Sequence, residues 1–148
     1  FEKILGQTDT RVLAQEWILR NLNPGTIAQI GGRRNFRIML EPELLPWFKS
    51  SYFDQKEEQN FLSIDFTNLE SKPDYVIAYD SLTPFLKIEP WLWQKLEQSA
   101  KKLTCFEPYE PGVNPRPLYD QQDAFFVPFA RFDGIVRPGP RICIYEMK

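Results

Sequence analysis

The sequence predicts an α/β fold: a small sandwich with a mostly parallel sheet of about four strands flanked by helices, plus a long loop rich in proline and aromatic residues. Three observations lead to this expectation. Short apolar runs typical of buried strands alternate with two segments of helical periodicity. The chain has 148 residues, of which 43% are hydrophobic and 26% charged, as in an ordinary globular domain. It also contains 13 prolines and 22 aromatic residues (12 Phe, 6 Tyr and 4 Trp), which favour stiff, packed loops.

A helix and a short strand are expected near the start of the chain. Apolar residues recur at helical spacing between residues 9 and 22, and Asp9 or Thr10 can cap the first turn. Pro24 ends this helix, because proline cannot continue it. Residues 26–30 are short, apolar and β-prone, so they are expected to form a buried strand.

The other elements are expected after residue 72. Residues 75–79 form a continuous apolar run, which suits a central strand covered on both faces. Pro90 opens a second amphipathic helix, whose buried stripe we assign to Leu92, Leu96, Ala100 and Leu103. Residues 103–106 and 141–147 are predicted strands. On the last strand, Ile142 and Ile144 should face one way, and Cys143, Tyr145 and Met147 the other.

Two segments are harder to interpret. Residues 36–40 are either a second short strand or a continuation of the first, and residues 41–72 show no clear period.

Residues 107–140 contain seven prolines and form a long loop. Its phenylalanines favour at least partial packing onto the domain, although a rigid aromatic loop is also the best candidate for binding another molecule.

Composition excludes several classes of function. The chain has no histidine, which removes the commonest general base and the commonest metal ligand. The net charge of −2 gives no electrostatic drive toward nucleic acid. We therefore expect no metal, no cofactor and no nucleic-acid partner. Cys105 and Cys143 are best interpreted as two buried thiols, and a disulfide between them stays open.

The candidate binding residues are few. Gly31-Gly32-Arg33-Arg34 follows a strand, and its two arginines could hold a phosphate, although a turn with solvated arginines is the favoured interpretation. Asp80 ends the central strand, where α/β sheets place ligand-binding groups, and a cap is the favoured alternative.

Aromatic side chains and carboxylate pairs supply the other candidates. Of Trp91 and Trp93, one should be in the core and the other more exposed; Trp93 is a candidate for stacking on a sugar, and Tyr119 is its counterpart in the long loop. A carboxylate pair for glycoside hydrolysis, joining Asp80 to Asp65, Asp74 or Asp133, is the least favoured idea, because no spacing brings two of these acids together.

Three segments, in order along the chain, resemble one protein family. Residues 9–30 read DTRVLAQEWILRNLNPG and then TIAQI, residues 73–81 read PDYVIAYDS, and residues 137–148 read RPGPRICIYEMK. They are similar to the opening helix and strand, the central strand and the closing turn and strand of a soluble domain. That domain is the extracytoplasmic C-terminal domain of bacterial dolichyl-phosphate-mannose–protein mannosyltransferase-like glycosyltransferases.

The resemblance implies a function and a location. Members are multi-pass membrane enzymes that transfer a sugar from a polyprenyl phosphate, with catalytic carboxylates in an early loop that has no counterpart here. The expectation is a non-catalytic accessory domain on the extracytoplasmic (periplasmic) side, which positions an acceptor or covers the active site. Residues 1–8 would be a tether from a preceding membrane segment, and residues 9–148 a single domain. Its partners would be the transmembrane part of the same polypeptide and a glycan or protein acceptor. The start at Phe1 rather than Met fits a fragment of a longer chain.

The alternative is a free-standing module that binds a glycan or a peptide through its aromatic loop. In either case no catalytic residue is assigned within this chain.

Overall fold

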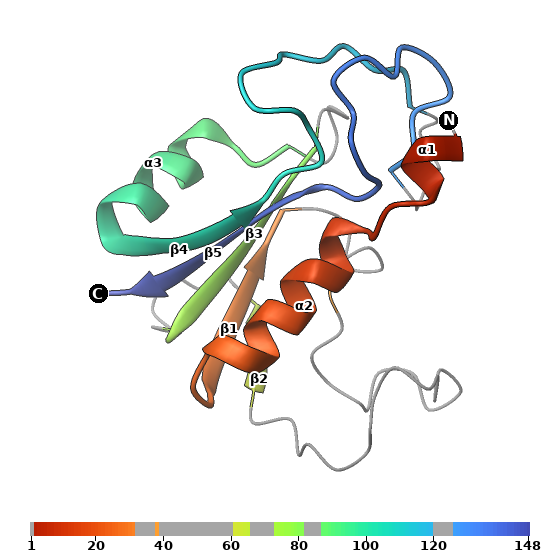
Figure 1. Ribbon diagram of the computed structural model, residues 1–148. Helices are drawn as coiled ribbons and strands as arrows, with labels where there is room; N and C mark the ends of the chain where they lie inside the picture. The colour runs from red at the N-terminus through yellow and green to blue at the C-terminus, as the bar shows by residue number, and fades with distance from the viewer. Residues whose placement is uncertain (1, 32–37, 39–60, 66–72, 82–86, 120–125) are drawn as a thin grey trace.

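The computed structural model describes residues 2–31, 38, 61–65, 73–81, 87–119 and 126–148 (Figure 1). Within these residues the chain forms three helices and five strands. The helices are α1 (Glu2–Leu5), α2 (Thr10–Asn21) and α3 (Pro90–Ser99). The strands are β1 (Gly25–Ile30), β2 (Phe61–Asp65), β3 (Tyr75–Asp80), β4 (Ala100–Phe106) and β5 (Arg141–Met147).

The strands form one sheet in the order β2-β1-β3-β5-β4. β1 pairs in parallel with β2 and β3, whereas β5 pairs antiparallel with β3 and β4. The expectation of a mostly parallel sheet of about four strands was therefore wrong, because the described sheet is mixed and has five strands. The cause is the position of β5, which runs against its two neighbours and separates them.

β3 and β4 keep the parallel direction that the sequence predicts for them. Since β5 is antiparallel to both β3 and β4, those two strands point the same way, as expected of two strands joined through a helix. The added strand, β2, lies in the segment for which the sequence showed no clear period. The predicted short strand at residues 36–40 lies outside the described residues, except for Ile38.

Two helices cover opposite faces of the sheet (Figure 1). Ala14 and Ile18 of α2 pack on one face, and Leu96 of α3 packs on the other. β5 contributes to both faces, because its side chains alternate: Ile142 and Ile144 lie under α2, whereas Cys143, Tyr145 and Met147 lie under α3. The predicted alternation on this strand is confirmed.

The ends of the helices follow from local chemistry. Asp9 caps α2, because its carboxylate accepts the backbone N–H of Arg11 at 2.8 Å. Pro90 occupies the first turn of α3, where its missing N–H costs nothing. α3 ends at Ser99, and β4 begins at the next residue. Ala100 and Leu103, expected on the helix, therefore belong to the strand, and Leu103 packs on the α2 face.

The segment from residue 107 to residue 140 connects β4 to β5, as expected of a long loop. Its described part contains two isolated bridges, Tyr109 with Ile135 and Leu118 with Ala130. A small cluster lies under it, in which Ile4 of α1 packs with Val127 and Ile135. α1 and this loop lie side by side beyond one end of the sheet (Figure 1). None of the helices described here has the length and apolar character needed to cross a bilayer.

Candidate functional site

The first site joins the two ends of the chain. Thr10, at the start of α2, is fully buried, and its hydroxyl donates a hydrogen bond to the carbonyl of Pro140 at 2.7 Å. The backbone N–H of Thr10 donates to the carbonyl of Pro138 at 3.1 Å. The Asp-Thr-Arg segment and the Arg-Pro-Gly-Pro segment, which the sequence singled out separately, thus form one junction.

Gly139 makes this junction possible. Its backbone has a φ of 102°, which favours glycine, and an added Cβ would collide with the Thr10 hydroxyl oxygen. On one side, Arg137 donates to the carbonyl of Thr8 at 3.3 Å. The junction is therefore closely packed and leaves no room for a ligand at Gly139.

Arg11 completes the junction from the helix side. Its guanidinium binds the Asp9 carboxylate through two hydrogen bonds, of 2.9 and 2.7 Å, and lies 5.4 Å from the ring centre of Phe126. Both polar side chains are used within the domain. We interpret the whole junction as a structural element.

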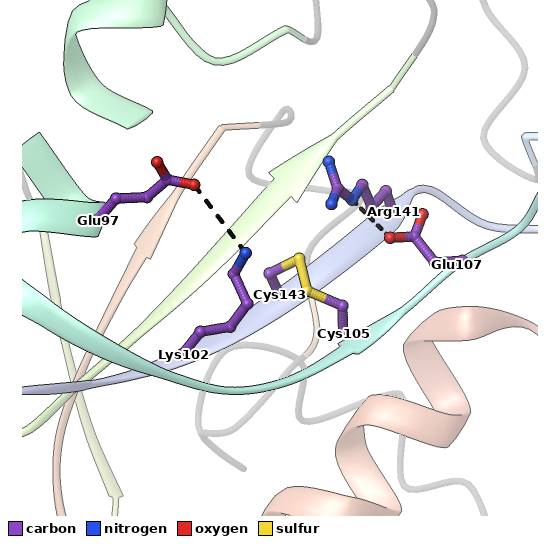
Figure 2. The surroundings of a disulfide bond; sticks show 6 residues. All are labelled: Glu97, Lys102, Cys105, Glu107, Arg141 and Cys143. Carbon is purple, nitrogen blue, oxygen red and sulfur yellow. Dashed lines mark hydrogen bonds and ion pairs between the residues drawn. A yellow bond between two sulfur atoms is a disulfide. The ribbon is translucent and has the colours of Figure 1, made fainter. Parts of the chain in front are cut away.

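A second cluster lies on the α3 face, at the carboxyl end of β3. Asp80 and Arg141 are register partners on β3 and β5. Arg141 donates to Glu107 at 2.8 Å (Figure 2). It also lies 5.9 Å from the ring centre of Trp93. The structure thus brings two predicted site residues, Asp80 and Trp93, to the same arginine.

Burial dominates the electrostatics of Asp80. Burial raises the pKa of its carboxyl, and the charge of Arg141 together with the backbone N–H groups of Ile88 and Ser81 opposes that rise. Arg141 forms an ion pair with Glu107 and is the register partner of Asp80, so its charge is already compensated within the chain. This arrangement favours an internal ion cluster over an anion-binding site.

Trp93 is the inner member of the predicted pair of tryptophans. Trp93 projects from α3 onto the edge of the core, with its ring centre 6.3 Å from that of Tyr145. Trp91, on the same helix, is 57% exposed. The prediction of one inner and one exposed tryptophan is therefore confirmed only in part, because Trp93 is half-buried at the edge of the core.

A disulfide lies beside this cluster. Cys105 of β4 and Cys143 of β5 are directly opposite in the register, with Cα atoms 4.1 Å apart, and their sulfur atoms are bonded (Figure 2). The favoured interpretation as two buried thiols was wrong. The sequence could not decide this, because pairing depends on β4 and β5 being neighbours.

A hollow of about 300 Å³ opens at the opposite end of the sheet. Asp74, Glu146 and Lys148 contribute its charged groups. The Asp74 carboxylate accepts the backbone N–H of Thr26 at 2.7 Å and its hydroxyl at 2.8 Å, which holds the pKa of Asp74 below its ordinary value. The Asp74 carboxylate is therefore already used in hydrogen bonds that stabilise the fold. We interpret the hollow as a contact between the ends of neighbouring strands.

Asp74 also tests the idea of a hydrolytic carboxylate pair. It precedes β3, whereas Asp80 ends this strand, so six residues of extended chain separate them, or about 20 Å. Glycosidases hold their two carboxyl groups about 5–10 Å apart. These two acids therefore do not form such a pair.

Three predicted site residues remain: Arg33, Arg34 and Tyr119. Arg33 and Arg34 lie outside the described residues. Gly31, which precedes them, has a φ of 74°, and an added Cβ would meet the carbonyl of Tyr79. The positive φ of Gly31 itself is typical of a glycine in a turn. Tyr119 is half-buried in the long loop, next to the bridge at Leu118.

Two functional features were missed by the sequence analysis. Arg141 had been assigned only to the closing motif, although a charged residue that starts a buried strand is a usable signal. Gln29, Tyr79 and Ile38 form a closed buried network: Tyr79 donates to Gln29 at 2.6 Å and accepts from Ile38 at 3.0 Å. Gln29 donates to the Ile38 carbonyl at 3.2 Å, so the network serves to hold Ile38 against the sheet.

Among the described residues, no group of three or more cysteine or acidic side chains is arranged to hold a metal ion. Comparison with family models, with curated proteins and with solved structures gives no match for this chain.

Proposed function

We propose that this chain is a non-catalytic extracytoplasmic domain of a membrane glycosyltransferase that uses a polyprenyl-phosphate sugar. Within the enzyme it would position the acceptor or cover the active site. The observation that carries the proposal is the junction between Thr10 and the carbonyls of Pro138 and Pro140. Two of the three segments behind the family resemblance meet there, 130 residues apart in sequence.

The contact matters because it makes the two motifs interdependent. Thr10 needs the turn for its hydrogen bonds, and Gly139 is required beside Thr10 because a side chain would collide there. Such interdependence is what we expect if both segments come from one kind of domain, and it supports the proposal.

The disulfide between Cys105 and Cys143 supports the proposed side of the membrane. Disulfides form and persist in oxidising compartments such as the bacterial periplasm, and they are rare in the reducing cytosol. The bond is therefore compatible with an extracytoplasmic location.

The direct test is the coding sequence upstream of Phe1. The proposal expects at least about eight apolar segments of about 20 residues, each long enough to span a bilayer. Fewer such segments would rule it out.

A second test concerns chemistry and sidedness. Full-length protein in membranes should transfer sugar from a labelled polyprenyl phosphate, whereas the 148-residue chain alone should not. Protease added to spheroplasts should reach this domain without permeabilisation of the inner membrane. Turnover by the isolated chain, or protection from protease until the membrane is opened, would contradict the proposal.

A further inference from the structure

The loop between β4 and β5 exposes two apolar side chains on segments whose backbones are hydrogen-bonded to each other. Phe129 is 64% exposed and Leu118 is 41% exposed. The N–H of Phe129 donates to the carbonyl of Leu118 at 2.9 Å, and the N–H of Leu118 donates to the carbonyl of Ala130 at 3.0 Å. The two segments thus meet at one isolated bridge between Leu118 and Ala130, and we call residues 116–119 and 128–131 the Phe129 ribbon.

The backbone around Phe129 holds its side chain outward. Phe126 and Arg131 have positive φ angles of 55° and 62°, a conformation that costs about 1 kcal/mol or more at each non-glycine residue. Between them, Val127 and Pro128 are buried, so the segment is anchored on the domain on the near side of Phe129. Exposure of Phe129 therefore follows from an anchored and strained backbone.

Two arginines lie close in sequence to these apolar side chains. Arg116 and Arg131 are both exposed, one in each segment of the Phe129 ribbon, and Asp133 is the exposed acid beside Arg131. Within the part of the chain that the structure describes, neither guanidinium forms an ion pair. Apolar side chains bordered by unpaired cations match the interface of an anionic bilayer, where aromatic rings enter the headgroup region and cations meet phosphates.

We propose that the Phe129 ribbon docks on the surface of an anionic lipid bilayer. Phe129 and Leu118 enter the boundary between headgroups and acyl chains, and Arg116 and Arg131 contact lipid phosphates. This inference rests on the proposed function only for the presence of a bilayer nearby. The chemistry of the surface is a property of this chain alone.

The position of α1 agrees with this orientation. Ile4 packs with Val127 and Ile135, so α1 lies against the same loop (Figure 1). Leu5 of α1 is exposed. If residues 1–8 are a tether from a membrane segment, the tether and the Phe129 ribbon lie at the same end of the domain. One bilayer surface is then within reach of both.

The test is flotation of the 148-residue chain with lipid vesicles. The chain should float with vesicles of phosphatidylethanolamine and phosphatidylglycerol, and should float less with vesicles of phosphatidylcholine alone. Phe129→Ala should weaken the partition about tenfold, because one aromatic side chain no longer enters the interface. Phe129→Trp should restore it, since tryptophan favours the interface.

The matched control is Trp91→Ala. Trp91 is also an exposed aromatic residue, but it lies on α3, so its loss should leave flotation unchanged. Arg116→Gln combined with Arg131→Gln should abolish the preference for phosphatidylglycerol. The proposal is overturned if the unchanged chain does not float, if Trp91→Ala reduces flotation as much as Phe129→Ala, or if glycans compete with the vesicles for the Phe129 ribbon.

Failure of this inference differs from failure of the proposed function. Vesicle binding through Phe129 without upstream membrane segments would keep the docking surface and remove the glycosyltransferase assignment. Upstream membrane segments without vesicle binding would do the reverse.

Discussion

Among the described residues, Tyr145 has a buried hydroxyl group that forms no hydrogen bond. The residue is 1% exposed, and among the described residues its hydroxyl has no hydrogen-bond partner. A buried polar group without a partner costs free energy. Tyr145→Phe should therefore raise the free energy of unfolding, by about 1 kcal/mol, in urea titrations. A loss of stability would show that the hydroxyl has a partner.

The pKa of Tyr145 leads us to expect a loss of stability at alkaline pH. Burial raises the pKa of Tyr145 to about 12, with the negative charge of Glu97 adding to the rise. Since the unfolded chain loses this proton near pH 10, stability should fall as the pH rises from about 10 toward 12. Ultraviolet titration should show one tyrosine ionising near pH 12 in the original chain, and that step should be missing in Tyr145→Phe.

Asp74 governs stability at the acid end. Hydrogen bonds from Thr26 hold its pKa below the ordinary value, so its contribution is present above about pH 4 and is lost as the pH falls through the folded-state pKa. Asp74→Asn should be less stable than the original chain at neutral pH, and the difference should shrink in acid. Melting temperatures across a pH series measure this, with Asp133→Asn in the exposed loop as control. A difference that stays constant at all pH values would exclude a role for the charge.

Residue-scale features were predictable where they depend on local periodicity. The alternation along β5 and the division between Trp91 and Trp93 follow from strand and helix geometry. The burial of Thr10 was not predictable, because its partner carbonyls lie at the far end of the chain. Thr10 had been considered only as a cap, and Asp9 takes that role.

At the scale of elements, Gly139 shows how a turn depends on what packs against it. Gly139→Ala should cost more than about 2 kcal/mol, because the φ is unfavourable and the new methyl group meets Thr10. Gly112→Ala is the matched control: its φ of 75° is also positive, but an added Cβ meets nothing within 4 Å. Its cost should be only the backbone term, about 1 kcal/mol. Equal losses in urea unfolding would show that the contact with Thr10 does not matter.

The disulfide ties the edge strand β4 to β5. It closes a long stretch of chain, since its cysteines are 38 residues apart, so its reduction should lower the free energy of unfolding by about 2–4 kcal/mol. Urea unfolding with and without reductant measures this. The double variant Cys105→Ala and Cys143→Ala should show no response to reductant. If reductant leaves the urea unfolding of the original chain unchanged, the disulfide is absent.

The elements were largely predictable, and their arrangement was not. Helix caps, prolines and apolar runs act within a few residues and located α2, α3 and four of the five strands. The place of β5 between β3 and β4 depends on a connection of more than thirty residues, whose path no local pattern records. The predicted binding residues met the same limit, because Arg141, which is the register partner of Asp80 and lies over the ring of Trp93, belongs to this inserted strand.

At the scale of the whole molecule, the domain is closed by contacts between its first long helix and its last strand. α2 covers one face of the sheet and begins at the turn from which β5 starts. The chain between them supplies the other strands and α3. Loss of this closure should therefore affect the whole domain at once.

Thr10→Val tests this closure. Valine has the shape of threonine but no hydroxyl, so the buried carbonyl of Pro140 would lose its hydrogen bond, at a cost of about 1–3 kcal/mol. Thr8→Val is the control, because the side chain of Thr8 is exposed. In hydrogen exchange, Thr10→Val should lose protection in α2 and in β5 by the same factor, since both ends depend on one contact. Loss confined to the first turn of α2 would show that the contact is local and that the two ends of the chain fold independently.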